Sequence, residues 1–306
     1  MSTAHPLPPP PTGPPTGPAT GPSVTAGGAG RAEPAATAIA AAARPRRFGA
    51  LYVAEHQLRA MRSYGWTIVM SGIGSPVLYL LGLGLGLATF LDVPVAFGPD
   101  GAVPYVVFVA PALLATAAIT VSTEEFTYTV MAGFKWRRVF WGMNASPLAP
   151  QQVAGGLVLA VLVRMAFVCV AYAALVALFG ALGRGGAVVV LPLIGLLGGL
   201  AFGMPLLAFA ASLKDDAGQF AAVQRFVFTP MFLFSGTFYP LATLPGWLHW
   251  IGWVSPLWHA SELGRVVSYG HPVPGWLVTV HVAVLVVLAA GGWLLARRTF
   301  VRRLRG

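Results

Sequence analysis

The sequence predicts an all-α membrane protein with six transmembrane helices, an N-terminal interfacial helix and a re-entrant outer segment before the last helix. Of the 306 residues, 57% are hydrophobic and only 9% are charged, whereas roughly a quarter of an ordinary soluble domain is charged. The mean hydropathy is +0.74, and several apolar runs are long enough to cross a hydrocarbon core of about 30 Å. Composition therefore excludes a soluble enzyme or a free binding module.

The first 45 residues differ in composition from the rest of the chain. Three four-residue repeats rich in Pro, Thr and Gly occupy 11–22 and precede an Ala-rich stretch. Such a segment has too little apolar bulk to offset the entropy lost on ordering, and it lacks the basic opening of a signal peptide. We predict a disordered, dispensable cytoplasmic tail over residues 1–45.

Residues 46–65 are expected to form an amphipathic helix on the inner membrane surface. Phe48, Leu51, Leu58 and Met61 can share one face, with Arg side chains elsewhere on the circumference. Arginines at a membrane surface interact favourably with anionic lipid headgroups. The alternative is an ordinary cluster of charges beside the membrane.

Residues 66–306 are predicted to form one transmembrane domain. Its apolar runs are long enough to span, and the Pro and Gly residues inside them are tolerated where helices pack together. The predicted spans cover 66–90, 103–121, 153–182, 187–213, 220–239 and 276–296. Gly195, Gly199 and Gly203 recur at every fourth position, which allows close helix contact within or between subunits.

The basic residues orient these spans. With six spans, nearly all of the 19 Lys and Arg residues fall on the same side of the membrane as the two termini. Lys and Arg are enriched in cytoplasmic loops, so we predict a protein of the cytoplasmic (inner) membrane with both termini cytoplasmic. The net charge of +10 is spread thinly between apolar runs, and we expect no nucleic-acid partner.

The sequence contains no motif for ATP hydrolysis or for hydrolytic chemistry. Neither lysine follows a glycine, so a Walker A motif is absent, as are HExxH and GxSxG. The single cysteine excludes an internal disulfide and a Cys-rich metal site. We predict no catalytic residue, no metal site and no cofactor bound by this chain. Only His259 and Glu262, three residues apart, could form a catalytic pair in a lipid-acting enzyme.

Two ionisable residues, Arg164 and His281, are expected at membrane depth. Arg164 can pair with Glu124 or Glu125 or extend to the membrane surface, and His281 can be a packing residue or a proton relay. Acidic and His residues at membrane depth are typical of ion-coupled transporters. An ion-driven secondary transporter or channel is therefore the alternative function.

The cytoplasmic connection between the second and third predicted spans, Ser122–Gly156, is unusually long for a chain with otherwise short loops. It carries Arg137 and Arg138 at one end of a segment, 136–144, that can form a short helix. A helix of this kind suits docking into a partner's groove. The alternative is a solvated loop whose arginines bind lipid.

The segment 247–269, between the fifth and sixth predicted spans, is apolar but broken by Gly and Pro. Tryptophans recur every three positions from Trp247 to Trp253, which suits a short helix at the outer headgroup level. A Ser-Pro pair then separates two helix-like pieces. Glu262 and Arg265 can pair across one helical turn.

Two motifs carry a resemblance to a known family. The first is Ser-Gly-Thr-Phe-Tyr-Pro at 235–240, followed by Leu-Pro at 244–245 and a spaced Pro, His, Glu and Arg series at 256–265. The second is Ser-Pro-Leu at 146–148. They resemble the signature before the last helix, and the loop after the second helix, of type-2 ATP-binding-cassette (ABC-2) export permeases. Residues 134–148 are similar to the nodulation lipooligosaccharide and daunorubicin-resistance branches.

The resemblance covers residues 46–306 and implies the permease subunit of an ATP-driven exporter. Such permeases form dimers with a second copy or a sister permease, and bind two copies of a separate ATPase that holds the ATP and Mg. Their cargo is amphipathic, either a drug-like or antibiotic-like molecule or a lipid-linked saccharide.

The resemblance also assigns two functional segments. The ATPase-coupling loop is implied to comprise Arg137, Arg138, Met143, Ser146, Pro147 and Leu148. The outer re-entrant gate is implied to comprise Ser235, Gly236, Pro240, Pro245, Pro256, His259, Glu262 and Arg265.

Overall fold

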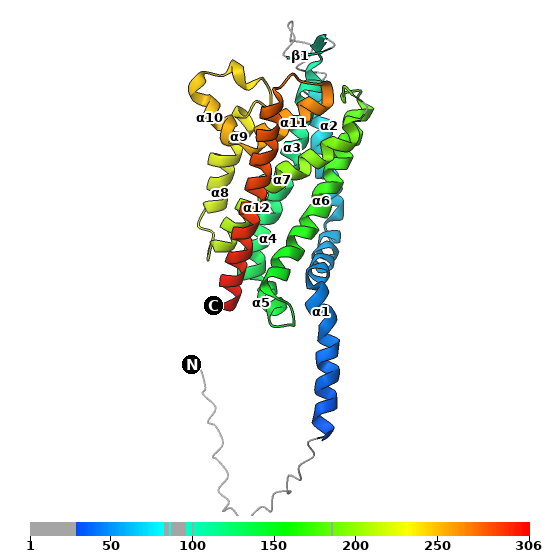
Figure 1. The fold of residues 1–306 in the computed structure, drawn as a ribbon, viewed down its shortest axis with the longest axis vertical. Coiled ribbons are helices and arrows are strands. Elements are labelled where there is room, and N and C mark those ends of the chain that lie inside the picture. Colours follow the sequence, from blue (N-terminus) through cyan, green and yellow to red (C-terminus); the bar gives the residue numbers. More distant parts are fainter. Residues whose placement is uncertain (1–28, 83–85, 87–95, 100, 185) are drawn as a thin grey trace, which may run out of the picture. The chain divides into compact units, whose positions relative to one another are not determined.

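The computed structural model describes residues 29–82, 86, 96–99, 101–184 and 186–306, which are mostly helical (Figure 1). The chain divides into two units, Met1–Ala41 and Ala42–Gly306. The disorder predicted for 1–28 lies outside the described residues, as does most of the first predicted span beyond residue 82.

Helix α1 (Ala29–Arg62) begins well before the predicted amphipathic segment. Residues 29–45 are helical, which differs from the disorder expected for them. Alanine has the highest intrinsic helix propensity, and this stretch is rich in alanine. The backbone departs from helical angles at Phe48 (φ −113°, ψ 19°), where two helical pieces meet.

The second piece of α1 packs on the beginning of α6 (Pro150–Leu178). A Cβ on Gly156 would lie 2.4 Å from the Val53 side chain, so the two backbones approach closely. Gln152 donates to the Arg46 carbonyl oxygen over 2.7 Å. Of the four residues of the predicted apolar face, Met61 is buried, whereas Phe48 and Leu51 are exposed.

Four helices in the described part are long and apolar enough to cross a membrane. They match the second, third, fourth and sixth predicted spans. Their bounds are Tyr105–Trp136, Pro150–Leu178, Ala187–Ser212 and Gly275–Arg305. The first comprises α3 (Tyr105–Phe126), α4 (Tyr128–Met131) and the π-helical turn η3 (Ala132–Trp136), and the others are α6, α7 and α12.

The fifth predicted span is shorter in the structure, whereas most of the first predicted span beyond residue 82 lies outside the described residues. Within the described residues, the first is represented by α2 (Gly65–Leu81), which has 17 residues. The fifth is a run of three short elements: α8 (Gln219–Val223), η4 (Gln224–Phe228) and α9 (Thr229–Phe234). The described part thus contains an all-α bundle with four helices of spanning length.

An antiparallel hairpin was not predicted. Strand β1 (Ala96–Gly98) pairs with β2 (Gly101–Val103), with Ala96 opposite Val103. It leads directly into α3.

The predicted connection Ser122–Gly156 is wrong in length. The helical structure continues to Trp136 and resumes at Pro150, which leaves residues 137–149 as the connection. The two glutamates at 124–125 had suggested the end of a span. The helix passes through them because buried apolar residues follow: Phe126, Val130, Met131 and Phe134.

Helix α7 occupies the centre of the bundle and packs against α3, α6, α11 (Pro256–Tyr269) and α12 (Figure 1). A Cβ at Gly195 would lie 2.3 Å from Leu114, and one at Gly199 would lie 2.5 Å from the sulfur of Met165. The regularly spaced glycines of α7 therefore serve close packing inside the subunit.

Candidate functional site

Two of the predicted gate residues, Ser235 and Pro256, lie at the start of α11. Ser255 caps this helix: its Oγ accepts hydrogen bonds from the backbone N–H groups of Leu257 (3.2 Å) and Trp258 (3.3 Å). Pro256 follows at the first helical position, which suits its fixed φ. Ser235 donates to Ser255 Oγ over 2.7 Å. The predicted break at Ser-Pro is confirmed, since α10 (His249–Val254) ends directly before it.

Arg265 on α11 is the largest fully buried side chain, with 1% of its surface exposed. Its guanidinium donates to Glu262 Oε1 over 2.7 Å, which confirms the predicted pair. It also donates to the carbonyl oxygens of Gly236 (2.5 Å) and Phe108 (3.3 Å). Its Cζ lies 3.9 Å from the centroid of the Phe108 ring, a cation–π distance. We call this group the outer arginine network.

The outer arginine network therefore joins three separate segments. Glu262 and Arg265 come from α11, Gly236 from the loop after α9, and Phe108 from α3. Gly236 adopts φ +70°, a left-handed conformation that only glycine tolerates easily. Sequence reasoning missed Phe108, which lies 157 residues before Arg265. It contributes a backbone carbonyl group and a ring, and neither gives a local signal in the sequence.

His271, just beyond α11, extends the outer arginine network. Its Nε2 lies 3.4 Å from Glu262 Oε2. Burial lowers the pKa of His271, and the Glu262 carboxylate opposes this shift. The neutral ring is therefore favoured near neutral pH, and the main charged partner of Glu262 is Arg265.

Two buried histidines meet beside the same helix. His259 Nδ1 lies 2.7 Å from His281 Nδ1, and His259 Nε2 lies 3.0 Å from the Trp253 carbonyl oxygen. A carbonyl only accepts, so Nε2 of His259 carries the hydrogen; in the neutral ring Nδ1 then accepts from His281. His281 is thus a packed, hydrogen-bonded residue. Glu262 bonds Arg265 and His271 rather than His259, so the possible catalytic pair does not form.

The remaining predicted gate residues lie outside the outer arginine network. Pro240 and Pro245 precede the short 3-10 helices η5 (Leu241–Thr243) and η6 (Gly246–Leu248). The tryptophans of the predicted interfacial series are exposed: Trp247, Trp250 and Trp253.

The predicted coupling loop contains helix α5 (Val139–Asn144), near the end of the bundle opposite α10 and α11 (Figure 1). Arg137 and Arg138 are exposed before it, and Ser146 and Pro147 are exposed after it. Ser146 donates to the Met143 carbonyl oxygen over 2.6 Å, which closes the turn. We call residues 137–148 the coupling turn.

The coupling turn is anchored to two spanning helices by aromatic rings. Phe140 packs edge-on against Phe134 with ring centroids 5.0 Å apart, and Phe300 of α12 lies 5.7 Å from Phe140 and 5.0 Å from Phe134. All three rings are buried. Asn144 also donates to the Leu304 carbonyl oxygen over 3.0 Å.

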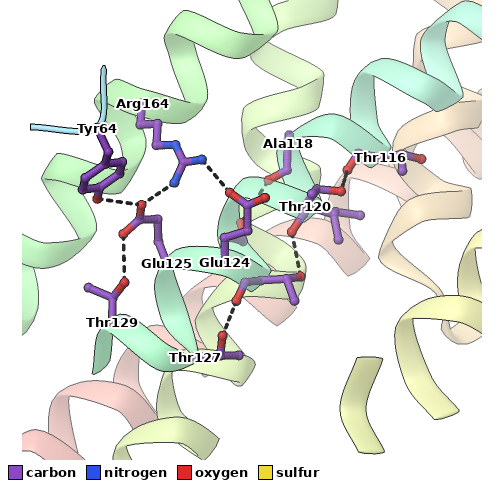
Figure 2. A network of polar contacts seen from close by, with 12 residues as sticks. Tyr64, Thr116, Ala118, Thr120, Glu124, Glu125, Thr127, Thr129 and Arg164 are labelled. Carbon is purple, nitrogen blue, oxygen red and sulfur yellow. Dashed lines mark hydrogen bonds and ion pairs between the residues drawn. The ribbon is translucent and has the colours of Figure 1, made fainter. Parts of the chain in front are cut away.

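A second buried arginine forms the network drawn in Figure 2. Arg164 of α6 donates to Glu124 Oε2 over 2.5 Å and also pairs with Glu125 Oε1, so both predicted partners are used. Tyr64 and Thr129 make long hydrogen bonds of 3.4 and 3.3 Å to Glu125. We call this group the inner arginine network.

The two glutamates of the inner arginine network differ in environment. The Glu125 side chain is 3% exposed, whereas that of Glu124 is 49% exposed. Burial and the neighbouring Glu125 carboxylate raise the pKa of Tyr64 to about 12. Sequence reasoning missed Tyr64, which lies between α1 and α2 and carries no charge to signal its role.

Hydroxyl side chains recur along α3 and at the residue that follows it (Figure 2). Thr116, Thr120, Thr123 and Thr127 each donate to the carbonyl oxygen four residues earlier, over 2.7–2.9 Å. Such back-bonding satisfies polar groups inside an apolar bundle and bends helices slightly.

The sequence was compared with known protein families and with characterised proteins. Residues 48–269 match the model of a family described as ABC-2 type transporter. The chain is 30% identical over 217 residues to nodulation protein J of Neorhizobium galegae, covering 71% of this chain and 79% of that protein. It is 28% identical over 239 residues to nodulation protein J of Rhizobium leguminosarum bv. viciae, covering 77% and 87%. The chain belongs to the ABC-2 type transporter family.

Proposed function

We propose that the chain is the membrane-spanning permease subunit of an ATP-driven exporter in the cytoplasmic membrane. A separate ATPase subunit supplies the energy, with ATP and Mg bound to that partner. Family membership and the four helices of spanning length support a multi-pass transporter subunit.

The observation that carries the proposal is the anchoring of the coupling turn. The ring of Phe140 packs against both Phe134, in the helical run that continues from α3, and Phe300 of α12. Interiors are close-packed and transmit displacement rather than absorbing it. A push on α5 by an ATPase would therefore reach two spanning helices directly.

The rest of the assembly follows from the same proposal. Two ATPase copies bind a dimer formed with a second copy or a sister permease, and both termini are cytoplasmic. Six spans result if α2 and the α8–α9 run cross the membrane as well. Then α10 and α11 form the outer gate, with exposed tryptophans at the headgroup level.

The proposed cargo is amphipathic. A drug-like or antibiotic-like molecule and a lipid-linked saccharide both suit the apolar bundle. The resemblance of residues 134–148 to the nodulation lipooligosaccharide branch supports the saccharide class.

The test is co-purification from the native membrane, followed by export measurements. The double variant Arg137→Glu, Arg138→Glu should insert normally but lose a Walker-containing ATPase and ATP-dependent export. The matched control is Arg297→Glu, Arg298→Glu, which reverses two adjacent exposed arginines on α12. Unchanged export by the coupling-turn variant would contradict the proposed role.

One observation favours the alternative of an ion-driven transporter or channel. Buried ionisable groups inside a membrane bundle are functional candidates, and those of the described residues include Arg164, Glu125, His259 and His281. Arg164 pairs with Glu125 and His259 contacts His281, but Nε2 of His281 is buried without a hydrogen-bond partner in the described part of the chain. Export that survives ATP depletion and is abolished by a protonophore would favour the alternative.

A further inference from the structure

A basic cavity of about 540 Å³ lies beside the coupling turn. Its lining residues come from η3, the coupling turn, the loop after α7 and the end of α12. They are Phe134, Lys135, Arg138, Trp141, Lys214 and Arg303. Four of these six side chains are cationic and none is acidic, and we call the space the basic cavity.

The positive charge of the basic cavity is only partly balanced. Lys135 pairs with Asp215, whereas within the described residues Arg138 and Lys214 form no ion pair. Arg303 is held by neutral groups: it donates to the Ala211 carbonyl oxygen over 2.8 Å, and its Cζ lies 4.0 Å from the Phe134 ring centroid. Like charges gathered in one cavity repel one another until an anion enters.

The backbone of Arg138 supplies independent support. Its φ is +54°, and among the described residues it is the only non-glycine with positive φ. Glycine or asparagine would adopt this conformation with less strain. Strained residues persist where the surroundings hold them, and they concentrate at binding sites. An arginine at this position places its charge in the basic cavity at a cost in backbone energy.

The position of the basic cavity identifies the chemistry of its ligand. Lys214 lies two residues beyond the end of α7, and Arg303 lies in the last turn of α12. Both helices are of spanning length, so the basic cavity opens where a membrane presents its headgroups. Trp141, with its indole Nε1 bonded to the Phe134 carbonyl oxygen, adds an aromatic wall typical of that depth.

We propose that the basic cavity binds a phosphate group, either that of an anionic lipid headgroup or free phosphate. The arginine guanidinium matches the geometry of phosphate oxygens, and lysine adds charge without fixed direction. A bound phosphate would neutralise the cations around the coupling turn. The inference rests on the proposed function in one respect, which is that the end of the bundle with the basic cavity faces the cytoplasmic leaflet. Binding of phosphate itself requires no ATPase.

The experiment uses the full chain in nanodiscs of phosphatidylcholine with added phosphatidylglycerol. Native mass spectrometry counts the phosphatidylglycerol that remains bound after release into mild detergent. Arg303→Gln and Lys214→Gln should each reduce retention about fivefold, as expected for loss of one cation near an anionic lipid. Arg302→Gln is the matched control, because this neighbouring arginine is exposed and outside the basic cavity.

A second arm tests free phosphate. Inorganic phosphate is titrated against the thermal unfolding of the detergent-purified protein, with sulfate-free chloride buffer at equal ionic strength as the reference. Stabilisation by phosphate that is lost in Lys214→Gln supports free phosphate as the source. Lys214 is exposed in a loop, so this variant remains folded even if Arg303→Gln does not.

Two outcomes would overturn the proposal. One is equal phosphatidylglycerol retention and equal phosphate response in all variants. The other concerns Lys214→Gln alone: this variant binds phosphatidylglycerol and phosphate as the wild type does, but no longer co-purifies with the ATPase. That result would make the basic cavity a protein-docking surface. Neither result depends on transport, so failure here is distinguishable from failure of the proposed exporter function.

Discussion

Two arginines are buried in the described part of the bundle, and they are held in different ways. Arg265 is bound by two backbone carbonyl oxygens, one carboxylate and one ring, and all of these are fixed by the fold. Arg164 is bound by two carboxylates, one of which is half exposed. The outer arginine network is therefore a rigid anchor, whereas the inner one contains a partner that water can replace.

The two arginine networks differ in the free energy needed to break them during a transport cycle. Breaking the contacts of Arg265 leaves a buried cation and buried carbonyl groups without partners, which is costly. Releasing Glu124 from Arg164 still leaves Glu125 in place, and Glu124 regains solvent. We expect the inner arginine network to rearrange more easily than the outer one.

The largest expected effect is that of Arg265→Gln. The variant leaves Glu262 buried without its main charged partner and should lose about 3–5 kcal/mol of stability. The measurement is thermal unfolding in detergent, with Arg298→Gln, an exposed arginine, as the control. If the variant does not fold, Phe108→Leu should still show a loss of about 1 kcal/mol from the cation–π contact. Wild-type stability in both variants would refute the rigid anchor.

Arg164→Gln should cost about 3 kcal/mol, because it leaves Glu125 buried without its cation. The loss is at the lower end because the hydroxyls of Tyr64 and Thr129 remain bonded to Glu125 and half-exposed Glu124 regains water. Adding Glu125→Gln should restore part of this loss, since it removes the buried carboxylate. Thermal unfolding of Arg164→Gln, Glu125→Gln and the double variant, each compared with the wild type, gives a double-mutant cycle. Strictly additive losses would mean that Arg164 and Glu125 are not coupled.

Gly236→Ala tests the backbone side of the outer arginine network. Alanine at φ +70° should cost about 1–2 kcal/mol and displace the carbonyl group that Arg265 binds. Gly246→Ala is the matched control, because a Cβ there meets no atom within 4 Å and φ is not positive. Equal stability of the two variants would count against a strained, fixed loop.

The smallest effect is expected at Tyr64. Tyr64→Phe removes only a long hydrogen bond to Glu125 and should cost less than about 1 kcal/mol near neutral pH. The folded-state pKa of about 12 exceeds the ordinary value of 10.0. The neutral phenol therefore contributes stability that is complete below pH 10 and is lost as the pH rises to about 12. Unfolding scans over this range should show the variant losing less stability than the wild type.

Local spacing allowed part of these networks to be predicted. Glu262 and Arg265 lie one helical turn apart, so their pairing follows from the helix alone. Arg164 could be matched with Glu124 and Glu125 because charged residues are rare in the chain and few partners exist. The Ser-Pro break was readable from turn chemistry. The short helix of the coupling turn was predicted over 136–144 from its charged end and apolar residues, and the structure has it over Val139–Asn144.

Other features depend on tertiary packing and left no local signal. Phe108 binds Arg265 through a carbonyl group and a ring, which any phenylalanine possesses. The contact of His259 with His281 joins two different helices. The end of the second span was placed too early, since Glu124 and Glu125 resemble a boundary until Arg164 is known to neutralise them.

Helix α3 supplies partners to both arginines: Phe108 to Arg265, and Glu124 and Glu125 to Arg164. An axial shift of α3 therefore changes the contacts of both at once. Thermodynamic linkage makes such a connection symmetric. If cargo near the outer loop strengthens ATPase binding at the coupling turn by some factor, then the ATPase strengthens cargo binding by the same factor.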